Sequence, residues 1–362
     1  MRTPLRASTH NDGLHLGARG PTLVTVSEEN RQWRLRRRPE GALTPDVFEL
    51  VTQPTQAPSD GEVRVRVLEL SLDPANRVWI SGPSYRPAVE IGAVMDGFAV
   101  GEVVESRSDA MPVGTLVSGD LGWQDYAVRA AKDVRPLPGG TERPLSHHLG
   151  VLGVTGLTAY FGLLAVGKPK PKETVLVSGA AGATGSVVVQ IAKMWGCRVV
   201  GIAGSPAKCE WLTNELKLDA AINYRTQDVK AAVAETCPDG VDVYFDNVGG
   251  SILETALFAM RDRGRVVCCG AVSGYDGTAP PPGPRGVPGL LIARRLTMRG
   301  FIVTDFAPRF RDGIQALVKW IDTGYVKVRE DRIDGLERAP EGLVGLLAGE
   351  NIGKRYVHVA DR

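Results

Sequence analysis

The first part of the chain is patterned as short strands. Between about residues 22 and 149, runs rich in strand-forming residues are repeatedly broken by Pro and Gly. The predicted strands are Glu62–Leu70, Phe98–Glu105, Leu116–Gly119 and Asp125–Val128. Because short strands separated by turns at this spacing are typical of antiparallel sheets, we predict an antiparallel β domain with a partly closed barrel.

From about residue 172 to residue 301 the pattern changes to continuous apolar runs that alternate with helical stretches. The predicted strands are Thr174–Ser178, Arg198–Ala203, Ala220–Asn223, Val241–Asp246, Gly264–Cys269 and Leu296–Phe301. The predicted helices are Thr184–Trp195, Pro206–Lys217, Thr226–Cys237 and Gly250–Arg261. Strands without polar alternation indicate a parallel sheet that helices cover on both faces. Six strands in this rhythm predict a doubly wound dinucleotide-binding fold.

The remaining segments complete the predicted organisation. Gly277–Gly289 consists mostly of Pro and Gly, so we predict irregular structure, either a mobile flap near the site or an inert surface loop. A helix, Arg309–Thr323, then leads to a final strand, Ile352–Val359, which we expect to return to the β domain. The predicted division is a disordered N-terminal extension (1–21), a β domain (22–155, completed by 325–362) and a nucleotide domain (156–324).

Composition and charge narrow the possible functions. The 362 residues have ordinary globular composition and are enough for two domains. The formal net charge of +2 implies no basic face for nucleic acid, and we interpret the basic run Arg34–Arg38 as a solvated strand or turn edge. No apolar stretch has the length of a membrane-spanning helix.

The N-terminal segment and the cysteines bear on location. Met1–Pro21 has no apolar core of a signal peptide; its Arg, Ser and Thr content leaves a transit peptide as the alternative to a disordered extension. The five cysteines contain no C-x-x-C pair, so we predict reduced thiols in a cytoplasmic protein and no zinc bound by cysteine. They are Cys197, Cys209, Cys237, Cys268 and Cys269.

The strongest motif is the glycine-rich segment Val175–Gly185, which starts as an apolar strand and ends as a helix. Gly182 allows the backbone to approach a pyrophosphate, whose charge the helix N-terminus would meet. Gly185 permits close packing of helix on strand. The strict G-x-G-x-x-G spacing is absent, because Ala180 stands at the first pattern glycine. The strand–turn–helix context still favours a dinucleotide site over a bare tight turn.

The end of the second strand of this fold distinguishes NAD from NADP. NAD-dependent folds place an Asp or Glu there to bind the ribose 2′-hydroxyl. Here the strand ends Ile202–Ser205, with Gly204 and no carboxylate. Lys208 and Tyr224–Arg225 follow nearby; Lys208 alone would be interpreted as an exposed helix residue, but a small uncharged strand end with cations beside it accommodates a 2′-phosphate. We therefore predict NADP(H) as the cofactor.

Two other oxidoreductase chemistries lack their residues in this sequence. Short-chain dehydrogenases need Tyr-x-x-x-Lys, and none of the eight tyrosines has a Lys four residues later. Zinc alcohol dehydrogenases need a Gly-His-Glu segment where this chain reads Gly97–Phe98–Ala99, and a phenylalanine binds no metal. We predict a zinc-free site.

Eight segments resemble, in order, those of the medium-chain dehydrogenase/reductase superfamily. More closely, the chain resembles its zinc-free branch of prostaglandin and leukotriene reductases and plant and microbial enone or alkenal double-bond reductases. The segments are Asn30–Trp33, Ser71–Pro74, Gly150–Gly153, Gly156–Gly162, Gly179–Val188, Asp246–Gly250, Cys269–Tyr275 and Asn351–Lys354. The resemblance implies an α/β fold, with a Rossmann doubly wound parallel sheet beside a GroES-like β-rich domain. It also implies a homodimer that pairs through the last strands of the nucleotide domain.

The resemblance further implies roles for single residues. Positions that hold the adenosine 2′-phosphate are matched by Lys208 and Tyr224, next to Gly204. The pyrophosphate turn is matched by Gly182, Ala183, Thr184 and Gly185. Positions along the ribose and nicotinamide are matched by Asn247, Cys269, Gly270, Ala271, Phe301, Ile302, Val303 and Asn351. Tyr275 matches a tyrosine that donates to the substrate carbonyl.

These residues outline the reduction of an α,β-unsaturated ketone or aldehyde. Hydride reaches the β-carbon and negative charge collects on the carbonyl oxygen, where a hydrogen-bond donor gives the largest help. Tyr275, whose hydroxyl has an ordinary pKa of about 10, is the expected donor. The related reductases commonly carry an aromatic residue in the stretch where this chain reads Ala75–Asn76–Arg77. Trp79 and Tyr85 are the candidates to contact a small-molecule substrate in its place.

Two other functions stay open from the residues. One is a quinone reductase of the same superfamily, and the other is a non-catalytic NADPH-binding protein that acts as a sensor or structural partner. Asn247 and Asn351 beside the nicotinamide, together with Tyr275, favour catalysis, since a sensor needs only the adenosine half. Nothing in the sequence decides between enone and quinone.

Overall fold

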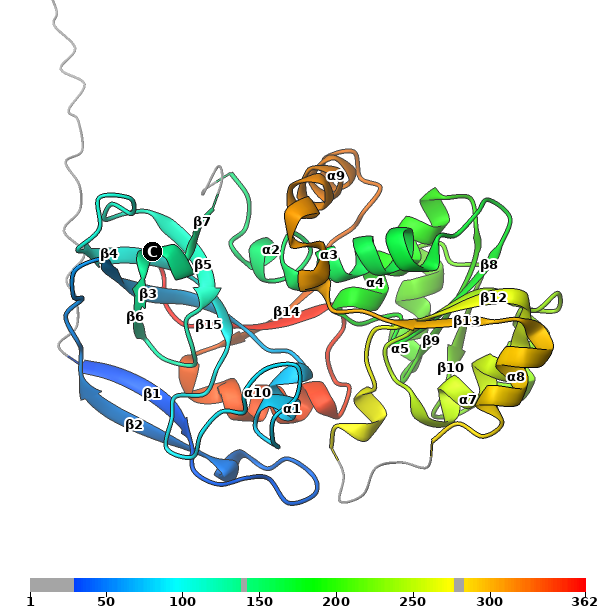
Figure 1. The fold of residues 1–362 in the computed structure, drawn as a ribbon, viewed down its shortest axis with the longest axis horizontal. Coiled ribbons are helices and arrows are strands. Elements are labelled where there is room, and N and C mark those ends of the chain that lie inside the picture. Colours follow the sequence, from blue (N-terminus) through cyan, green and yellow to red (C-terminus); the bar gives the residue numbers. More distant parts are fainter. Residues whose placement is uncertain (1–28, 138–141, 277–282) are drawn as a thin grey trace, which may run out of the picture.

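The structure is a computed structural model that describes residues 29–137, 142–276 and 283–362. Its elements form two bodies, a β-rich one built from the N-terminal strands and the C-terminal segment, and an α/β one built from the middle of the chain (Figure 1). The predicted extension 1–21 lies outside the described residues. No helix in the described ranges has the length and apolar character needed to cross a bilayer.

The α/β body contains a six-stranded sheet in which every strand pair is parallel. Its strand order, β10-β9-β8-β11-β12-β13, reverses direction between β8 and β11, as in a doubly wound dinucleotide-binding fold. The strands are β8 (Thr174–Ser178), β9 (Arg198–Ala203), β10 (Ala220–Asn223), β11 (Val241–Asp246), β12 (Met260–Cys268) and β13 (Thr297–Gly300). The prediction of a six-stranded parallel sheet is confirmed.

Alternate residues of these strands enter two separate hydrophobic cores. Val175 and Val177 of β8 belong to one core, whereas Leu176 between them belongs to the other. Because side chains alternate across a strand, both faces of the sheet must be covered. The first core includes residues of α3, α4 and α9, and the second those of α6 and α7. The helices are α3 (Val154–Phe161), α4 (Ala183–Met194), α5 (Pro206–Glu210), α6 (Val229–Thr236), α7 (Gly250–Ala259), α8 (Val287–Arg294) and α9 (Phe310–Asp322).

The β-rich body contains a hairpin, β1-β2, and a seven-stranded sheet in the order β14-β15-β3-β4-β5-β7, with β6 also on β3. One edge of β3 pairs with β4, while β6 and β15 share its other edge at residues 62–66 and 69–71. This branching curls the sheet into a partly closed barrel. The strands are β1 (Glu29–Leu35), β2 (Phe48–Pro54), β3 (Glu62–Ser71), β4 (Phe98–Ser106), β5 (Leu116–Asp120), β6 (Tyr126–Ala130), β7 (Arg135–Pro136), β14 (Glu330–Asp334) and β15 (Lys354–His358).

The C-terminal strand returns to the first body, as the sequence predicts. β15 runs antiparallel to β3 and parallel to β14, so it lies inside the sheet rather than at its edge. Helix α10 (Ala339–Leu347) packs Leu343 into the core of this body, and the short helices α1 (Ala75–Trp79) and α2 (Ser146–Leu149) complete it. The boundaries near residues 155 and 324 stay predictions.

Three predictions for the middle of the chain were wrong in detail. The segment Gly277–Gly289 was expected to be irregular throughout, but its last residues form the first turn of α8, which begins at Val287. The predicted flap falls largely on residues 277–282, which lie outside the described ranges. The last strand is shorter than Leu296–Phe301, because it ends at Gly300. The helix after β9 changes from α5 to a π-helical turn at Trp211–Glu215.

A group of titratable side chains is buried between β3, β14, β15 and α2. Glu69 on β3 lies directly opposite His358 on β15, so both side chains are on one face of the sheet. Glu69 Oε2, Glu330 Oε1 and the Nδ1 atoms of His147 and His358 are buried without a hydrogen-bond partner among the described residues. Burial, followed by the negative charge of Glu330, raises the pKa of Glu69 to about 7. Ionised Glu69 therefore costs stability near neutral pH.

We expect Glu69→Gln to stabilise the protein by on the order of 1–2 kcal/mol at neutral pH, after allowance for solvent screening. The folded pKa of about 7 exceeds the ordinary value of 4.5, so the wild type loses stability relative to the variant as the pH rises between these values. Denaturant unfolding of both proteins from pH 4 to 8 measures this difference. Glu49→Gln, at an exposed position of β2, is the control. A difference that does not change with pH would contradict the prediction.

Candidate cofactor and active site

The glycine-rich turn joins β8 to α4 at the carboxyl edge of the parallel sheet. Gly185 lies against the strand so closely that a Cβ would be 2.2 Å from the carbonyl oxygen of Gly179. Gly182 precedes the first residue of α4 in extended conformation and supplies no side-chain cap. The first N–H groups of α4, which include those of Ala183 and Thr184, are therefore available to an anion.

The other predicted cofactor residues follow the neighbouring strands at the same edge. Gly204 comes directly after β9, Tyr224 after β10, Asn247 after β11 and Cys269 after β12. Because carboxyl ends of parallel strands share one edge of a sheet, these residues, far apart in sequence, are brought to a single crevice. Figure 1 shows this edge facing the β-rich body.

A cationic pocket lies at the ends of β9 and β10. A Cβ at Gly204 would be 2.8 Å from the ring of Tyr224, so only glycine allows the tyrosine to pack there. Lys208 Nζ donates to the carbonyl oxygen of Gly349 at 2.7 Å, and Arg225 Nη2 donates to that of Ala348 at 2.7 Å. The C-terminal segment thereby closes the pocket and holds the two cations side by side.

The electrostatics of this pocket fit a bound anion. Lys208 is only 9% exposed. Burial, followed by the positive charges of Arg225 and Arg355, lowers the pKa of Lys208. A dianionic phosphate would offset both effects, since it supplies the opposite charge that the buried ammonium lacks. Arg225 belongs to this pocket, although its neighbour Tyr224 is the residue matched by resemblance.

Asp246 at the end of β11 organises the centre of the crevice, and the sequence analysis missed it. Its Oδ1 accepts hydrogen bonds from the hydroxyls of Ser178 and Tyr244 and from the N–H groups of Val248 and Gly249, at 2.7–3.0 Å. Burial, and then the charge of Asp246, raise the pKa of Tyr244 well above its ordinary value. A carboxylate at the end of an otherwise apolar strand was the available signal.

Asn247 is fixed by the same arrangement. Its backbone N–H donates to Ser178 Oγ at 2.9 Å, and its Nδ2 donates to the Ser178 carbonyl at 2.7 Å. The backbone carbonyl of Asp246 accepts the N–H groups of Cys269 and Gly270 at 2.9 and 3.0 Å. The loops after β8, β11 and β12 are therefore hydrogen-bonded to one another.

The C-terminal segment is hydrogen-bonded to the glycine-rich turn. Asn351 is buried, and its Nδ2 donates to the Gly353 carbonyl at 2.8 Å. The N–H of Gly353 in turn donates to the carbonyl of Ala181 at 2.8 Å. Asn351 is thus hydrogen-bonded to the residue that joins the C-terminal segment to the glycine-rich turn.

Phe301, Ile302 and Val303 differ in how their side chains are packed and exposed. The Phe301 ring packs on Gly162, where a Cβ would be 2.5 Å from it, and meets Phe306 edge-on at 6.2 Å. Ile302 is 40% exposed, whereas Val303 is buried in the core. The Ile302 side chain can therefore contact a ligand. The Val303 side chain cannot, so Val303 could contact a ligand only through its backbone.

Tyr275 lies in the loop after β12, and its hydroxyl accepts the N–H of Ala271 at 3.1 Å. Burial is the main cause that raises its pKa; the nearby Cys269, Tyr85 and Asp246 add to it, and the Ala271 N–H opposes it. Tyr275 therefore carries its proton at neutral pH and can donate it in a hydrogen bond.

Trp79 and Tyr85, the predicted substrate contacts, lie next to each other on the β-rich body. Tyr85 is 58% exposed, whereas Trp79 is 4% exposed. The indole Nε1 of Trp79 donates to the Tyr85 hydroxyl at 2.9 Å, and Arg86 stacks over the Trp79 ring at 4.4 Å. Trp79 thus orients Tyr85 from beneath, and Tyr85 is the one available for contact.

Metal ligands are not grouped in this crevice. Phe98, at the position where zinc alcohol dehydrogenases have a histidine, meets the Trp79 ring edge-on at 6.3 Å. Within the described part of the chain, no three His, Cys, Asp or Glu side chains are placed to hold a metal ion. Burial raises the pKa of Cys269 to about 12, so this thiol next to the site stays protonated.

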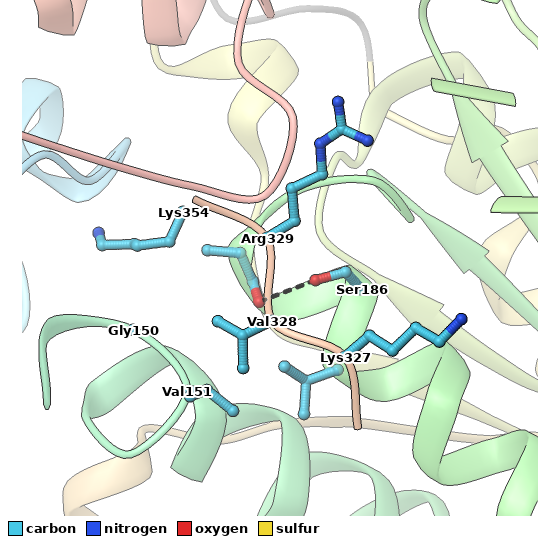
Figure 2. A pocket seen from close by; sticks show the side chains of 9 residues that line it. Gly150, Val151, Ser186, Lys327, Val328, Arg329 and Lys354 are labelled. Carbon is cyan, nitrogen blue, oxygen red and sulfur yellow. Dashed lines mark hydrogen bonds between the residues drawn. The ribbon is translucent and has the colours of Figure 1, made fainter. Parts of the chain in front are cut away.

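A small cavity marks the joint between the two bodies (Figure 2). Its volume of about 10 Å³ is enough for one water molecule and far too small for a cofactor. Figure 2 shows Lys327, Arg329 and Lys354 leaving it in different directions. Lys354 Nζ donates to the Leu72 carbonyl and to Asp73 Oδ1 at 2.8 and 2.7 Å. The cavity therefore belongs to the joint and not to the site.

A two-body fold with a doubly wound parallel sheet and a cationic pocket at the ends of β9 and β10 is typical of NADP(H)-dependent oxidoreductases. Two family models match the chain: "N-terminal domain of oxidoreductase" over residues 31–137 and "Zinc-binding dehydrogenase" over residues 183–322. The second covers β9 to β13 of the nucleotide-binding sheet and does not include the position of Phe98. Its description therefore names a family and not a metal in this chain.

Characterised relatives match over nearly the whole chain. The NADPH-dependent curcumin reductase of Escherichia coli is 40% identical over 92% of this chain and 98% of its own length. Prostaglandin reductase 1 of Rattus norvegicus is 42% identical over 90% and 98%. A crystal structure of CurA from Vibrio vulnificus in complex with NADPH superposes with a TM-score of 0.87 at 37% identity, covering 92% and 100%. The chain belongs to the zinc-independent branch of the medium-chain dehydrogenase/reductase family.

We expect Lys208→Ala to weaken NADPH binding about ten- to hundredfold, the effect of losing one charge-assisted hydrogen bond. Affinity for NADH should change less than about twofold. Fluorescence titrations with NADPH, NADH and 2′,5′-ADP measure these affinities, and Lys230→Ala, at an exposed lysine of α6, is the control. Equal losses for NADPH and NADH would show that Lys208 does not act on the 2′-phosphate.

Proposed function

We propose that the protein reduces the carbon–carbon double bond of α,β-unsaturated ketones or aldehydes with NADPH. The observation that carries this proposal is the protonated Tyr275 hydroxyl, held by the Ala271 N–H in the loop next to Asn247. The relatives named for curcumin and prostaglandin substrates support the same reaction class. The substrate is a small molecule that enters between the loop after β12 and the Tyr85 surface.

In this proposal the chain supplies hydrogen bonds and NADPH supplies the hydride that is added to the β-carbon. Negative charge then develops on the carbonyl oxygen, to which Tyr275 donates. Tyr85, whose hydroxyl accepts a hydrogen bond from Trp79, would donate to the same oxygen or to a neighbouring substrate group. The α-carbon receives its proton from Tyr275 or from solvent.

The cofactor residues divide by the part of NADP(H) that each would hold. Lys208, Tyr224 and Gly204 would hold the 2′-phosphate, with Arg225 added from the geometry of the pocket. The pyrophosphate would lie on Gly182, Ala183, Thr184 and Gly185. The ribose and nicotinamide would contact Asn247, Cys269, Gly270, Ala271, Phe301, Ile302, Val303 and Asn351. These assignments rest on the shared crevice and on the family resemblance.

Tyr275→Phe should lower the turnover of an enone by about a hundredfold, the usual loss when one donor to a developing oxyanion is removed. NADPH affinity should stay within about twofold, because the variant removes no cofactor contact. Steady-state kinetics and NADPH titration measure the two quantities. Tyr325→Phe, at a tyrosine that is 64% exposed, is the control. Full turnover by Tyr275→Phe would remove the residue from the mechanism.

The substrate class is tested by loss of NADPH absorbance with enones, enals, quinones and saturated ketones, repeated with NADH. We expect turnover of enones or enals and none of saturated ketones. Consumption with quinones and none with enones would replace the proposed function by the quinone reductase alternative.

We also propose that two copies pair through the outer edge of β13. Among the described residues no strand pairs with that edge. The neighbouring helix α8 has no buried side chain, and its Ile292 is 77% exposed. An open strand edge beside exposed apolar residues is the kind of surface that a second copy covers.

Ile292→Asp is expected to convert the dimer to a monomer, because it places a charge in the proposed interface. Light scattering coupled to size exclusion measures the mass. Val113→Asp, at a comparably exposed valine in the β-rich body, should leave the mass unchanged. A monomeric wild type would refute the proposed pairing.

A further inference from the structure

One ion pair joins the two bodies immediately beside the proposed donor. Asp276 follows Tyr275, and its Oδ1 accepts hydrogen bonds from Arg77 Nε at 3.1 Å and from the Leu43 N–H at 2.6 Å. Arg77 and Leu43 belong to the β-rich body, whereas Asp276 lies in the loop after β12. The loop that carries Tyr275 is therefore fastened to the other side of the crevice.

The Arg77 guanidinium is committed to this one position. Its side chain is 4% exposed, its Nη2 donates to the Gly41 carbonyl at 2.8 Å, and its Nη1 donates to Ser81 Oγ. Within the described residues, Arg77 forms no ion pair other than the one with Asp276. A buried guanidinium with a single carboxylate partner loses much when that partner leaves, because its charge is then uncompensated.

The two hydrogen bonds to Asp276 limit where Tyr275 can lie. Adjacent α-carbons are about 3.8 Å apart, so a carboxylate fixed to the β-rich body fixes the neighbouring backbone as well. At the tip of the Tyr275 side chain, the hydroxyl accepts a hydrogen bond from the Ala271 N–H. Without the Asp276 carboxylate, the loop keeps the hydrogen bond between Ala271 and Tyr275, but its position relative to Tyr85 is no longer fixed.

We propose that Arg77 and Asp276 are positioning residues that set the distance from Tyr275 to the substrate carbonyl. This proposal rests on the function proposed for Tyr275. The ion pair contacts neither substrate nor cofactor, and it acts by holding the loop from Ala271 to Asp276 against the β-rich body. Donor placement within a few tenths of an ångström is what a hydrogen bond to a developing charge requires.

The first test is a double-mutant cycle with Asp276→Ala and Tyr275→Phe. In the wild-type background, Asp276→Ala should lower kcat/KM for an enone at least about tenfold, with NADPH affinity within about twofold. In the Tyr275→Phe background, the same substitution should lower it less than twofold, because no donor remains to be positioned. Equal losses in both backgrounds, or no loss in either, would overturn the proposal.

The second test does not depend on turnover. The Leu43 amide should exchange with deuterium faster in cofactor-free Asp276→Ala, since its acceptor is removed. Unchanged exchange of Leu43 would overturn the ion pair itself. Asp262→Ala, which breaks the exposed ion pair with Arg295 in the same body, is the matched control and should change neither readout.

The two proposals fail in different ways. Full turnover by Tyr275→Phe alone would refute the proposed function, while the exchange of Leu43 would still report whether Asp276 fastens the loop. Asp276→Asn keeps an acceptor oxygen for the Leu43 N–H and removes the charge. It should therefore protect Leu43 more than Asp276→Ala does, and a Leu43 exchange rate equal to that of Asp276→Ala would overturn the proposed contact.

Discussion

The crevice depends on one buried carboxylate. Asp246 accepts four hydrogen bonds at a single side-chain oxygen, and its backbone carbonyl accepts two more. Through these contacts it connects Ser178, at the end of β8 just before the glycine-rich turn, with Cys269 at the start of the Tyr275 loop. Neutral residues at this position would leave several buried donors unsatisfied, each at a cost of about 1–3 kcal/mol. This part of the crevice is thus built around a carboxylate that faces inward and is only 2% exposed.

The parts of the fold that could be predicted are those where local pattern and tertiary environment agree. The strands β8, β9, β10 and β11 were predicted to the residue, because their apolar runs are buried on both sheet faces. Prediction was poorer at β13 and α8, where apolar residues such as Ile292 are exposed and a Pro lies in the first turn of the helix instead of excluding it. The hairpin β1-β2 was not assigned as strands, since its polar-rich residues carry little hydrophobic pattern.

For the site, sequence reasoning found residues at strand ends but not the contacts that hold them. Lys208 lies 141 residues from the Gly349 carbonyl it binds, and Arg77 lies 199 residues from Asp276. No local spacing encodes such a pair, because each partner is an ordinary charged residue within its own segment. The burial of Arg77 and the hydrogen bonds that Asp246 accepts are properties of the folded chain. The roles of the individual site residues still rest on resemblance and shared geometry.

The position of β15 has a consequence for how the molecule is assembled during synthesis. This strand lies between β14 and β3, yet the ribosome makes it after the entire nucleotide-binding body. The six parallel strands can therefore complete their sheet while the β-rich body still has an open edge along β3 at residues 69–71. That edge is a place where a nascent chain is exposed to wrong pairing until residues 354–358 emerge. The order of the chain thus makes the nucleotide-binding body available first and completes the β-rich body last.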